Sequence, residues 1–317
     1  MKTRRFLVIG GANMDITGSC QNTLLAGDSN PGQVKSAAGG VGRNIAENLA
    51  RLNNPTSLMT LVGDDIGRSV IQNSCEKAGI DQSNILINHH YCTGTYLSIN
   101  DHQGGLSVAV ADMTIIDQLT PAVLEANKQA LLDADEIVIE ANLPVDTIQW
   151  IADNANGKPL HADAVSVAKV SRLKPILSQL DILKVNRQEA QKLLGIKADD
   201  IALAQNLHQL GVKNVLLSLG SQGALLCCNE GGNEGPIIQS AIKTDIVSAN
   251  GSGDALFAGL ISAQKRLKSP AHQLEFAVAC ATFTLQSADA VNQDLSSAKI
   301  KHQFLSHFTL KHFILKQ

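Results

Sequence analysis

The sequence predicts an α/β fold with a doubly wound, mostly parallel sheet. Short runs rich in Val, Ile and Leu alternate with longer segments of helical period along the 317 residues, and this alternation is typical of parallel strands joined by crossover helices. Only 3% of the residues are aromatic, so aliphatic side chains must fill the core. We expect a single domain over residues 1–317, because no linker rich in Pro, Gly or Ser and no internal repeat divides the chain.

The hydrophobic pattern predicts each element in turn. Buried strands are expected at residues 6–9, 58–62, 136–139, 160–162, 182–184 and 214–218. Helices are expected at residues 42–52, 67–78, 145–154, 187–194, 200–210, 253–265 and 271–287. Basic residues precede the first apolar run, as in a signal peptide, but that run ends at Gly10 and is too short, so a strand is the better interpretation.

Two polar, turn-rich segments interrupt this rhythm, at about residues 16–38 and 91–115. Residues 96–99 and 106–110 alternate apolar and polar side chains, which favours half-exposed antiparallel strands. We therefore predict a small, discontinuous β lid over one edge of the main sheet. Two ordinary long loops are the alternative, although loops of this length are unusual unless they are functional.

Charge and composition exclude several classes of protein. The chain has 26 Lys and Arg against 29 Asp and Glu, a formal charge of −3, so it has no basic surface for nucleic acid or for an anionic membrane. No apolar run approaches the roughly 18 residues that a membrane span needs. The six Cys are scattered, without a C-x-x-C pair or a His at zinc-ligand spacing. We expect a reduced, cytoplasmic protein without a metal or disulfide scaffold.

Two polar clusters lie near the N-terminus. Asn13 and Asp15 follow the first strand, at the sheet edge where ligands bind in open α/β folds. An amide and a carboxylate two residues apart can hydrogen-bond the vicinal hydroxyls of a sugar, although a plain turn is the alternative. Residues 38–44, with Gly40 and Gly42, let a ligand approach a helix N-terminus. This cluster lacks the third glycine of a dinucleotide fingerprint, and the chain has no P-loop.

The sharpest cluster is Asn250-Gly-Ser-Gly-Asp254, at the start of a predicted helix. Gly251, Ser252 and Gly253 can turn successive backbone N–H groups towards one point and so form an anion hole. Asp254 then lies beside the anion's charge, where a carboxylate suits a general base that accepts a proton from an attacking hydroxyl. A helix cap is the simpler alternative.

Two softer clusters follow later strands. Glu189, in Asn186-Arg-Gln-Glu189, could hold water or Mg²⁺ near phosphates, or act as an ordinary partner of the helix dipole. Residues 218–223 form either a turn beside a nucleotide or a simple hairpin. Because all these clusters follow predicted strands, they would line one crevice. The chemistry they imply is phosphoryl transfer to a hydroxyl without a covalent nucleophile.

These residues resemble the signatures of the ribokinase (PfkB) family of carbohydrate and nucleoside kinases. Residues 39–44 are similar to the family's glycine-rich signature near the N-terminus. Residues 251–254 are similar to its anion hole with the catalytic Asp, and residues 186–189 are similar to its N-x-x-E motif. The resemblance covers about residues 5–295. It implies a ribokinase-like fold and ATP-dependent phosphorylation of a small molecule, with Mg²⁺.

The resemblance also implies a role for each matched position. Asp254 would be the catalytic base, and Gly251, Ser252 and Gly253 the anion hole. The residues that would hold the ribose are Asn13, Asp15, Gly40 and Asn44, with Glu140 or Asn142 as a further sugar contact. Those that would contact the nucleotide are Asn186, Glu189, Ser218, Gly220 and Gly223, with Glu189 holding Mg²⁺ through water.

Further stretches, including residues 28–32, 111–113, 162–166 and 292–296, are similar to a nucleoside-kinase branch of the family. This narrower resemblance implies phosphorylation of the 5′-hydroxyl of pseudouridine, while the resemblance to the family as a whole implies a homodimer through the lid. Thr93 and Asp112 are the candidates for reading the base. Ribose, adenosine or another nucleoside as substrate, and a binding module without catalysis, stay open as alternatives.

Two features depart from the family pattern or lie beyond it. Ser248 stands where the family often has an Asp linked to a monovalent-cation site, so a potassium requirement stays open. The tail from Lys299 onwards is predicted to form an amphipathic helix, with His302, His307 and His312 facing solvent.

Overall fold

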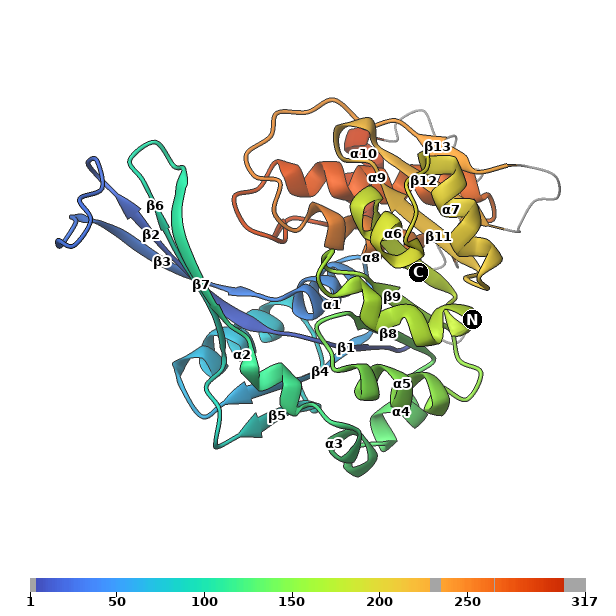
Figure 1. The fold of residues 1–317 in the computed structure, drawn as a ribbon, viewed down its shortest axis with the longest axis horizontal. Helices are drawn as coiled ribbons and strands as arrows, with labels where there is room; N and C mark the ends of the chain where they lie inside the picture. Colours follow the sequence, from blue (N-terminus) through green and yellow to red (C-terminus); the bar gives the residue numbers. More distant parts are fainter. Residues whose placement is uncertain (1–3, 229–234, 265, 305–317) are drawn as a thin grey trace.

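Two separate sheets organise the chain. The computed structural model describes residues 4–228, 235–264 and 266–304. A nine-stranded sheet has the order β13-β12-β11-β10-β9-β8-β1-β4-β5, and a four-stranded sheet has the order β3-β2-β6-β7. The smaller sheet extends away from the helix-covered body (Figure 1).

The large sheet is mostly parallel. Its strands are β1 (Phe6–Ile9), β4 (Thr56–Gly63), β5 (Ile85–Asn88), β8 (Glu136–Glu140), β9 (Leu160–Asp163), β10 (Ile182–Asn186), β11 (Asn214–Ser218), β12 (Ala224–Cys228) and β13 (Ile237–Gln239). Only β12 and β13, at one edge, pair antiparallel. All six predicted strands are present, whereas β5, β12 and β13 have no counterpart among them. The strand order reverses between β1 and β8, and such a switch point is where ligands bind in open α/β sheets.

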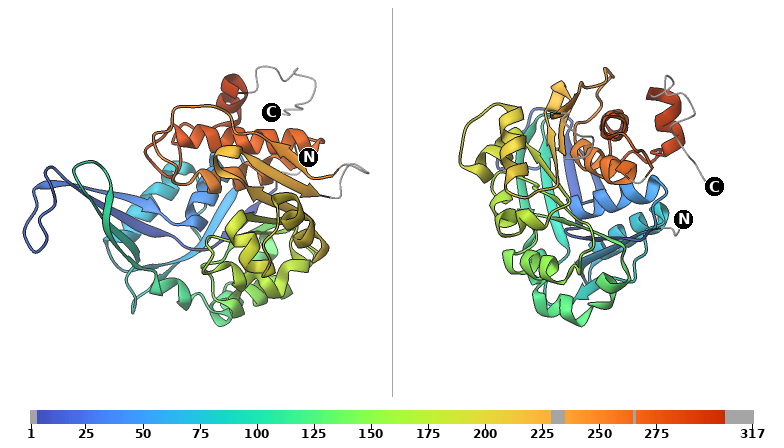
Figure 2. Two further views of the ribbon diagram at one scale, coloured as in Figure 1. Left: turned by 45° about the horizontal axis from the view of Figure 1, so that its top comes forward. Right: turned by 90° about the vertical axis from the view of Figure 1, so that its right-hand side faces the viewer.

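Helices cover both faces of this sheet, as the right-hand view of Figure 2 shows. One layer contains α1 (Val41–Arg51), α2 (Ile66–Ala78), α8 (Ser252–Gln264) and α9 (Pro270–Leu285). The other contains η1 (Thr114–Gln118), α3 (Pro121–Ala126), α4 (Gln129–Asp133), α5 (Val145–Asn154), η2 (Val170–Gln179), α6 (Arg187–Leu194) and α7 (Asp200–Gln209). Strand β1 supplies both cores by alternation, since Leu7 and Ile9 join one cluster and Phe6 and Val8 the other.

The close packing expected of the last two predicted helices is present in α8 and α9. A Cβ at Gly259 would lie 2.9 Å from the Cα of Ala277, so the absence of a side chain lets the two helices meet. Lys265, the predicted end of the first of these helices, lies outside the described residues.

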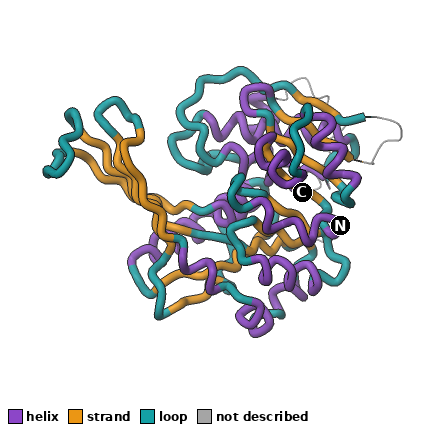
Figure 3. Tube along the Cα trace, in the orientation of Figure 1, coloured by secondary structure: helices purple, strands orange, loops and turns teal. Residues whose placement is uncertain are grey.

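The small sheet is built from two excursions of the chain. Strands β2 (Asn13–Cys20) and β3 (Gly32–Gly39) follow β1, and β6 (Gly94–Asn100) and β7 (Leu106–Asp112) follow β5. Both hairpins are antiparallel, as predicted, but β2 and β6 pair in parallel and join them. The parallel pairing arises because β2 and β6 both continue from parallel strands of the large sheet. In Figure 3 these strands run side by side in one projecting arm. The alternative that residues 16–38 and 91–115 are two ordinary long loops is therefore wrong.

The C-terminal part of the described chain ends in α10 (Ser297–Phe304), which packs on α9. This helix contains Lys299 and the exposed His302, while His307 and His312 lie outside the described residues. Within the described ranges, we find no helix that is both long and apolar enough to cross a membrane.

Candidate active site

A cavity of about 580 Å³ opens where the large and small sheets meet. Its volume lies within the range of about 300–1,000 Å³ that is typical of small-molecule sites. Eight residues predicted for the site line it: Asn13, Asp15, Gly40, Asn44, Asn142, Gly251, Gly253 and Asp254. They come from β2, the start of α1, the segment after β8 and the start of α8, so the fold brings together residues that are far apart in the sequence.

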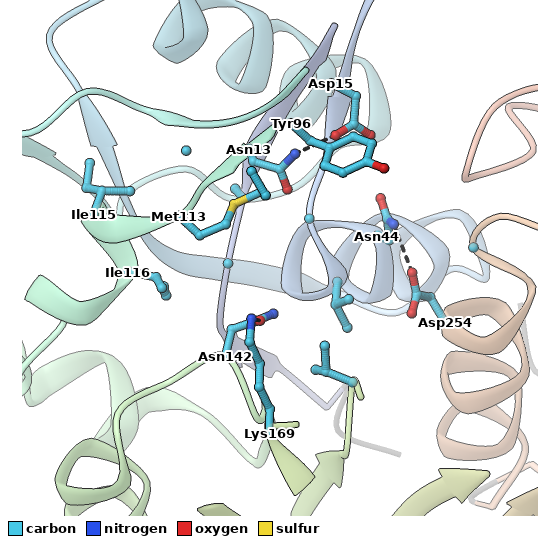
Figure 4. A pocket seen from close by; sticks show the side chains of 18 of the residues that line it. Asn13, Asp15, Asn44, Tyr96, Met113, Ile115, Ile116, Asn142, Lys169 and Asp254 are labelled. Atoms are coloured by element: carbon cyan, nitrogen blue, oxygen red, sulfur yellow. Dashed lines mark hydrogen bonds between the residues drawn. The ribbon is translucent and has the colours of Figure 1, made fainter. Parts of the chain in front are cut away.

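Asn13 and Asp15 lie at the root of β2, not in a turn. Because side chains two residues apart on a strand share a face, both point into the cavity (Figure 4). Asn13 Nδ2 donates to Asp15 Oδ1 at 2.5 Å. Burial raises the pKa of Asp15, while this hydrogen bond and the charge of Arg43 act in the opposite direction. The pair presents amide and carboxylate groups to a polar ligand.

The glycines at the start of α1 are required by backbone packing. Gly40 has φ of 100°, and a Cβ there would lie 2.5 Å from the carbonyl oxygen of Gly11. A Cβ at Gly42 would lie 2.8 Å from the carbonyl carbon of Gly10. Helix α1 therefore begins directly against the β1–β2 connection, which brings Asn44 to the cavity.

Asp254 lies in the first turn of α8, at the opposite side of the cavity from Met113 and Ile115 (Figure 4). It is 8% exposed, and its Oδ2 accepts a hydrogen bond of 2.8 Å from Asn44 Nδ2. Backbone N–H groups in the first turn of a helix have no intrahelical partner. The carboxylate thus stands beside a group of donors suited to an anion.

The turn before α8 depends on Gly251. This residue has φ of 74°, and a Cβ there would lie 1.8 Å from the carbonyl oxygen of Ala290, which no side chain could accommodate. Ser252 Oγ donates to the carbonyl of Ala249 at 2.9 Å, and Ser252 does not line the cavity.

A buried cluster of charges surrounds Asp254. Lys184 Nζ forms an ion pair of 3.0 Å with Asp163 Oδ2, and a Cβ on Gly253 would lie 3.1 Å from the same Nζ. Burial raises the pKa of Asp254 to about 7, and Asp163 adds to this effect, while Lys184 and the Asn44 hydrogen bond oppose it. Burial disfavours the Lys184 ammonium, but the charges of Asp163, Asp254 and Glu189 outweigh it and raise its pKa.

No role is predicted from the sequence for Lys184 or Asp163. The one available signal is a charged residue inside an otherwise apolar strand, since Lys is almost never buried without a partner. The register of the sheet supplies that partner, because Lys184 lies directly opposite Asp163.

Of the two candidates for a further sugar contact, Glu140 or Asn142, Glu140 does not line the cavity. Glu140 is fully buried, and its two carboxylate oxygens accept hydrogen bonds from the backbone N–H groups of Gly11 and Asn142, both at 2.7 Å. Burial raises its pKa to about 7. Glu140 instead ties together two loops of the site, and Asn142 is the one that reaches the cavity, where it accepts a hydrogen bond from Lys169.

The two residues predicted to read the base are not at the cavity. Thr93 is buried, and its Oγ1 donates to Asp65 Oδ1 at 2.6 Å. Asp112 is exposed at the end of β7, where it accepts hydrogen bonds from the backbone N–H and Oγ1 of Thr114. Local partners hold both side chains elsewhere, and β6 and β7 reach the cavity through Gly94, Tyr96 and Ala111 instead.

The residues predicted for the nucleotide lie at the carboxyl ends of β10 and β11. Asn186 and Glu189 form a capping box on α6, in which Glu189 Oε2 accepts from the Asn186 N–H at 2.7 Å. Ser218 lies opposite Asn186 in the sheet. Gly220 and Gly223 belong to the β11–β12 hairpin, through a short η3 helix (Gly220–Gln222). These five residues do not line the cavity itself.

The charges around Lys184 indicate whether these residues could take part in binding Mg²⁺. Across the described ranges, no three His, Cys, Asp or Glu side chains gather closely enough to hold a metal ion by themselves. Mg²⁺ is usually held by one or two carboxylates together with substrate phosphates and water. The three carboxylates of Asp163, Glu189 and Asp254 outnumber the two cations that act on them, Lys184 and Arg43, so the residues fit a cation that arrives with a phosphate group.

A doubly wound sheet with a buried carboxylate at a helix N-terminus, facing a small-molecule cavity, is an arrangement suited to a phosphotransferase that acts on a hydroxyl. The family model of the pfkB family carbohydrate kinases matches residues 3–297 of the chain. The chain therefore belongs to this family and is a kinase.

Individual relatives agree with this assignment. A pseudouridine kinase of Escherichia coli is 35% identical over 300 residues, which cover 93% of this chain and 94% of the relative. A carbohydrate kinase from Agrobacterium tumefaciens is 30% identical, with a TM-score of 0.85 over 95% of this chain and 97% of its own. A ribokinase from Arabidopsis thaliana, solved with ribose and ATP, is 24% identical, with a TM-score of 0.84 over 97% and 100% of the two chains.

Proposed function

We propose that the chain transfers the γ-phosphoryl group of ATP to the 5′-hydroxyl of pseudouridine, with Asp254 as general base. The observation that carries this proposal is the position of Asp254, which is buried at the start of α8, borders the cavity and is hydrogen-bonded by Asn44. The similarity to a pseudouridine kinase over nearly the whole chain supports the choice of substrate.

The cavity has walls of two kinds, which suits a nucleoside. Asn13, Asp15 and Asn44 form a polar side for the ribose hydroxyls, and Met113 and Ile115 form an apolar side at the other end (Figure 4). A nucleoside with its ribose on the polar side and its 5′-hydroxyl at Asp254 has its base directed towards the apolar side.

The proposed reaction needs no covalent intermediate. The substrate hydroxyl gives its proton to the carboxylate of Asp254, its oxygen forms a bond to the γ-phosphorus, and the bond between that phosphorus and the β–γ bridging oxygen breaks, so that ADP leaves. The N–H groups of Gly251, Ser252 and Gly253 would face the negative charge of the transferring group, and the Ser252 N–H would leave its long 3.4 Å hydrogen bond to the Ala249 carbonyl to do so. Lys184, beside Gly253, adds a positive charge at the same point.

The nucleotide and its metal complete the proposal. ATP would lie along the ends of β10 and β11, against Asn186, Ser218, Gly220 and Gly223. Mg²⁺, held through water by Glu189, would supply charge neutralisation on the phosphates. A requirement for ATP also favours the cytoplasm as the place of action.

A substrate panel tests this function. Pseudouridine, uridine, adenosine, guanosine and free ribose are compared by kcat/KM with ATP and Mg²⁺, and ADP formation is measured. We expect the highest kcat/KM with pseudouridine. A preference for ribose or adenosine would assign the chain to another activity of the same family, and calorimetric binding of a nucleoside without ADP formation would point to a binding module.

We also propose a homodimer through the small sheet. The pairing register puts Leu97 opposite Val110 and Ile99 opposite Val108, so these apolar side chains share one face. Val108 and Val110 are 54% and 62% exposed, and exposed apolar clusters commonly mark interfaces. A monomer in light scattering at micromolar concentration would contradict this proposal.

A further inference from the structure

A buried hydrogen-bonded chain on α1 ends at Asp254. Arg43 is 3% exposed, although Arg is rarely buried. Its guanidinium donates to Asn44 Oδ1, to Glu47 Oε2 and, at 2.9 Å, to Ser74 Oγ. Asn44 Nδ2 in turn donates to Asp254 Oδ2 at 2.8 Å.

Arg43 determines which end of the Asn44 amide faces Asp254. A guanidinium only donates hydrogen bonds and an ionised carboxylate only accepts them, while an amide has one accepting and one donating end. Asn44 between Arg43 and Asp254 therefore satisfies both neighbours in a single orientation, with Oδ1 towards Arg43. In the reverse orientation its NH₂ group would face the guanidinium and its oxygen would face the carboxylate.

The rest of the network fixes Arg43 in place. Glu47 is 1% exposed and neutralises the guanidinium. Its other oxygen accepts from Arg51 Nε at 2.8 Å and from Gln293 Nε2 at 3.3 Å. Because Glu47 has these further partners, it remains paired when the Arg43 side chain is shortened or made apolar.

Several charges act on Asp254 from the elements packed around it. Asp163 on β9 raises the pKa of Asp254, while Lys184 on β10 and Arg43 on α1 lower it, against a larger effect of burial. Arg43 is the member of this set that also acts through a hydrogen bond, because it orients the amide of Asn44.

We infer that Arg43 is a positioning residue for phosphoryl transfer: by orienting the Asn44 amide it holds Oδ2 of Asp254 and leaves Oδ1 to accept the proton of the substrate hydroxyl. This inference rests on the proposed role of Asp254 as the base. It gives the second residue of the Gly-Arg-Asn stretch a function separate from ligand contact, since Arg43 does not line the cavity.

The test compares Arg43→Met with the matched control Ser74→Ala, which removes a hydrogen bond to the same guanidinium without touching Asn44. The pH profile of kcat/KM is measured for both. In Arg43→Met we expect the acidic limb to move up by about one pH unit, the scale on which a nearby charge shifts a carboxyl group. Activity then falls about tenfold at pH 6 and much less at pH 8.5. Ser74→Ala keeps the wild-type profile.

A second readout separates this inference from the proposed function. The carboxyl carbon of Asp254, identified by its loss in Asp254→Asn, is titrated by ¹³C NMR in the free protein. An upward shift in Arg43→Met supports the inference even if Asp254→Asn retains turnover, in which case only the proposed base is wrong. If the acidic limb of the pH profile and the ¹³C titration of Asp254 in Arg43→Met both coincide with those of the wild type, the inference is overturned.

A third variant tests the positioning role of Arg43 if Arg43→Met does not fold. Arg43→Lys keeps the charge, but a single ammonium lacks the planar fork that spans Asn44 and Glu47. We expect a raised KM and a lowered kcat, because the Asn44 amide is no longer fixed. Wild-type values of both would refute a positioning role.

Discussion

Replacing Asp254 by Asn should abolish turnover and stabilise the fold at the same time. The pKa of Asp254 in the folded protein is about 7, against an ordinary value of 3.8. The folded state therefore binds this proton more tightly than the unfolded chain, and stability is lost as the pH rises from about 4 to about 7. Asn keeps the shape and an acceptor for Asn44 but carries no charge.

The magnitude follows from the same pKa. Each pH unit between the two values corresponds to about 1.4 kcal/mol, so the charge destabilises the wild-type fold by up to about 4 kcal/mol above pH 7. We expect Asp254→Asn to raise Tm at pH 8 by about 5 °C for a chain of this size. At pH 5, where the folded wild type is already protonated, the gain should be less than half as large.

Thermal unfolding at pH 5 and pH 8, with ADP release measured on the same samples, tests both effects. Turnover should fall at least about a thousandfold, since a general base contributes roughly 10²–10⁴ and the local charge is also lost. A variant that is less stable at pH 8 than the wild type would refute the account of a strained, buried carboxylate. Near-normal turnover would refute its role as the base.

Four further outcomes are expected. In the wild type, kcat/KM should fall about tenfold per pH unit below about 7, because protonated Asp254 accepts no proton; a flat pH–rate profile down to pH 5.5 would contradict this. Gly251→Ala should destabilise the fold by at least about 1–3 kcal/mol in denaturant titration, since its Cβ would meet the Ala290 carbonyl at 1.8 Å; wild-type stability would disprove the clash. Glu140→Gln should raise KM for the nucleoside severalfold, because an NH₂ group would face a backbone N–H; an unchanged KM would argue against loop anchoring. Val110→Asp should convert the proposed dimer to monomer in light scattering without loss of Tm, and a persistent dimer would place the interface elsewhere.

The parts of the fold predicted from sequence are those determined by local pattern. Buried parallel strands have near-continuous apolar sequences. Gly40 and Gly251 have positive φ and lie so close to other backbone atoms that a Cβ would clash there. The edge strands β5 and β13 have four and three residues and are only partly buried, so their pattern is weaker. β12 has five residues and is mostly buried, so shortness or exposure does not explain why it has no counterpart among the predicted strands. The small sheet was predictable from alternation, but its parallel β2–β6 pairing is a tertiary feature.

The predicted site residues that lie away from the cavity do so for a common physical reason. Whether a polar side chain faces a ligand depends on which partners are near it, and those partners are distant in the sequence. Thr93 is hydrogen-bonded by Asp65, 28 residues earlier, and Glu140 bonds Gly11, 129 residues away. The Lys184–Asp163 pair likewise requires the register of β9 and β10. Sequence alone supplies the residue types but not these pairings.

The path of the chain from β1 into β2 links the proposed sugar subsite to the far end of the molecule. Asn13 and Asp15 are the first residues of a strand whose other end belongs to the projecting tip. Because a paired strand is stiff, a tilt of the tip turns the root of β2 and redirects these two side chains. A ligand that binds one inclination of the small sheet more tightly than another therefore shifts the sheet towards that inclination. A substitution or a neighbouring molecule at the tip of the small sheet can therefore change ligand affinity at the root of β2 without touching the ligand.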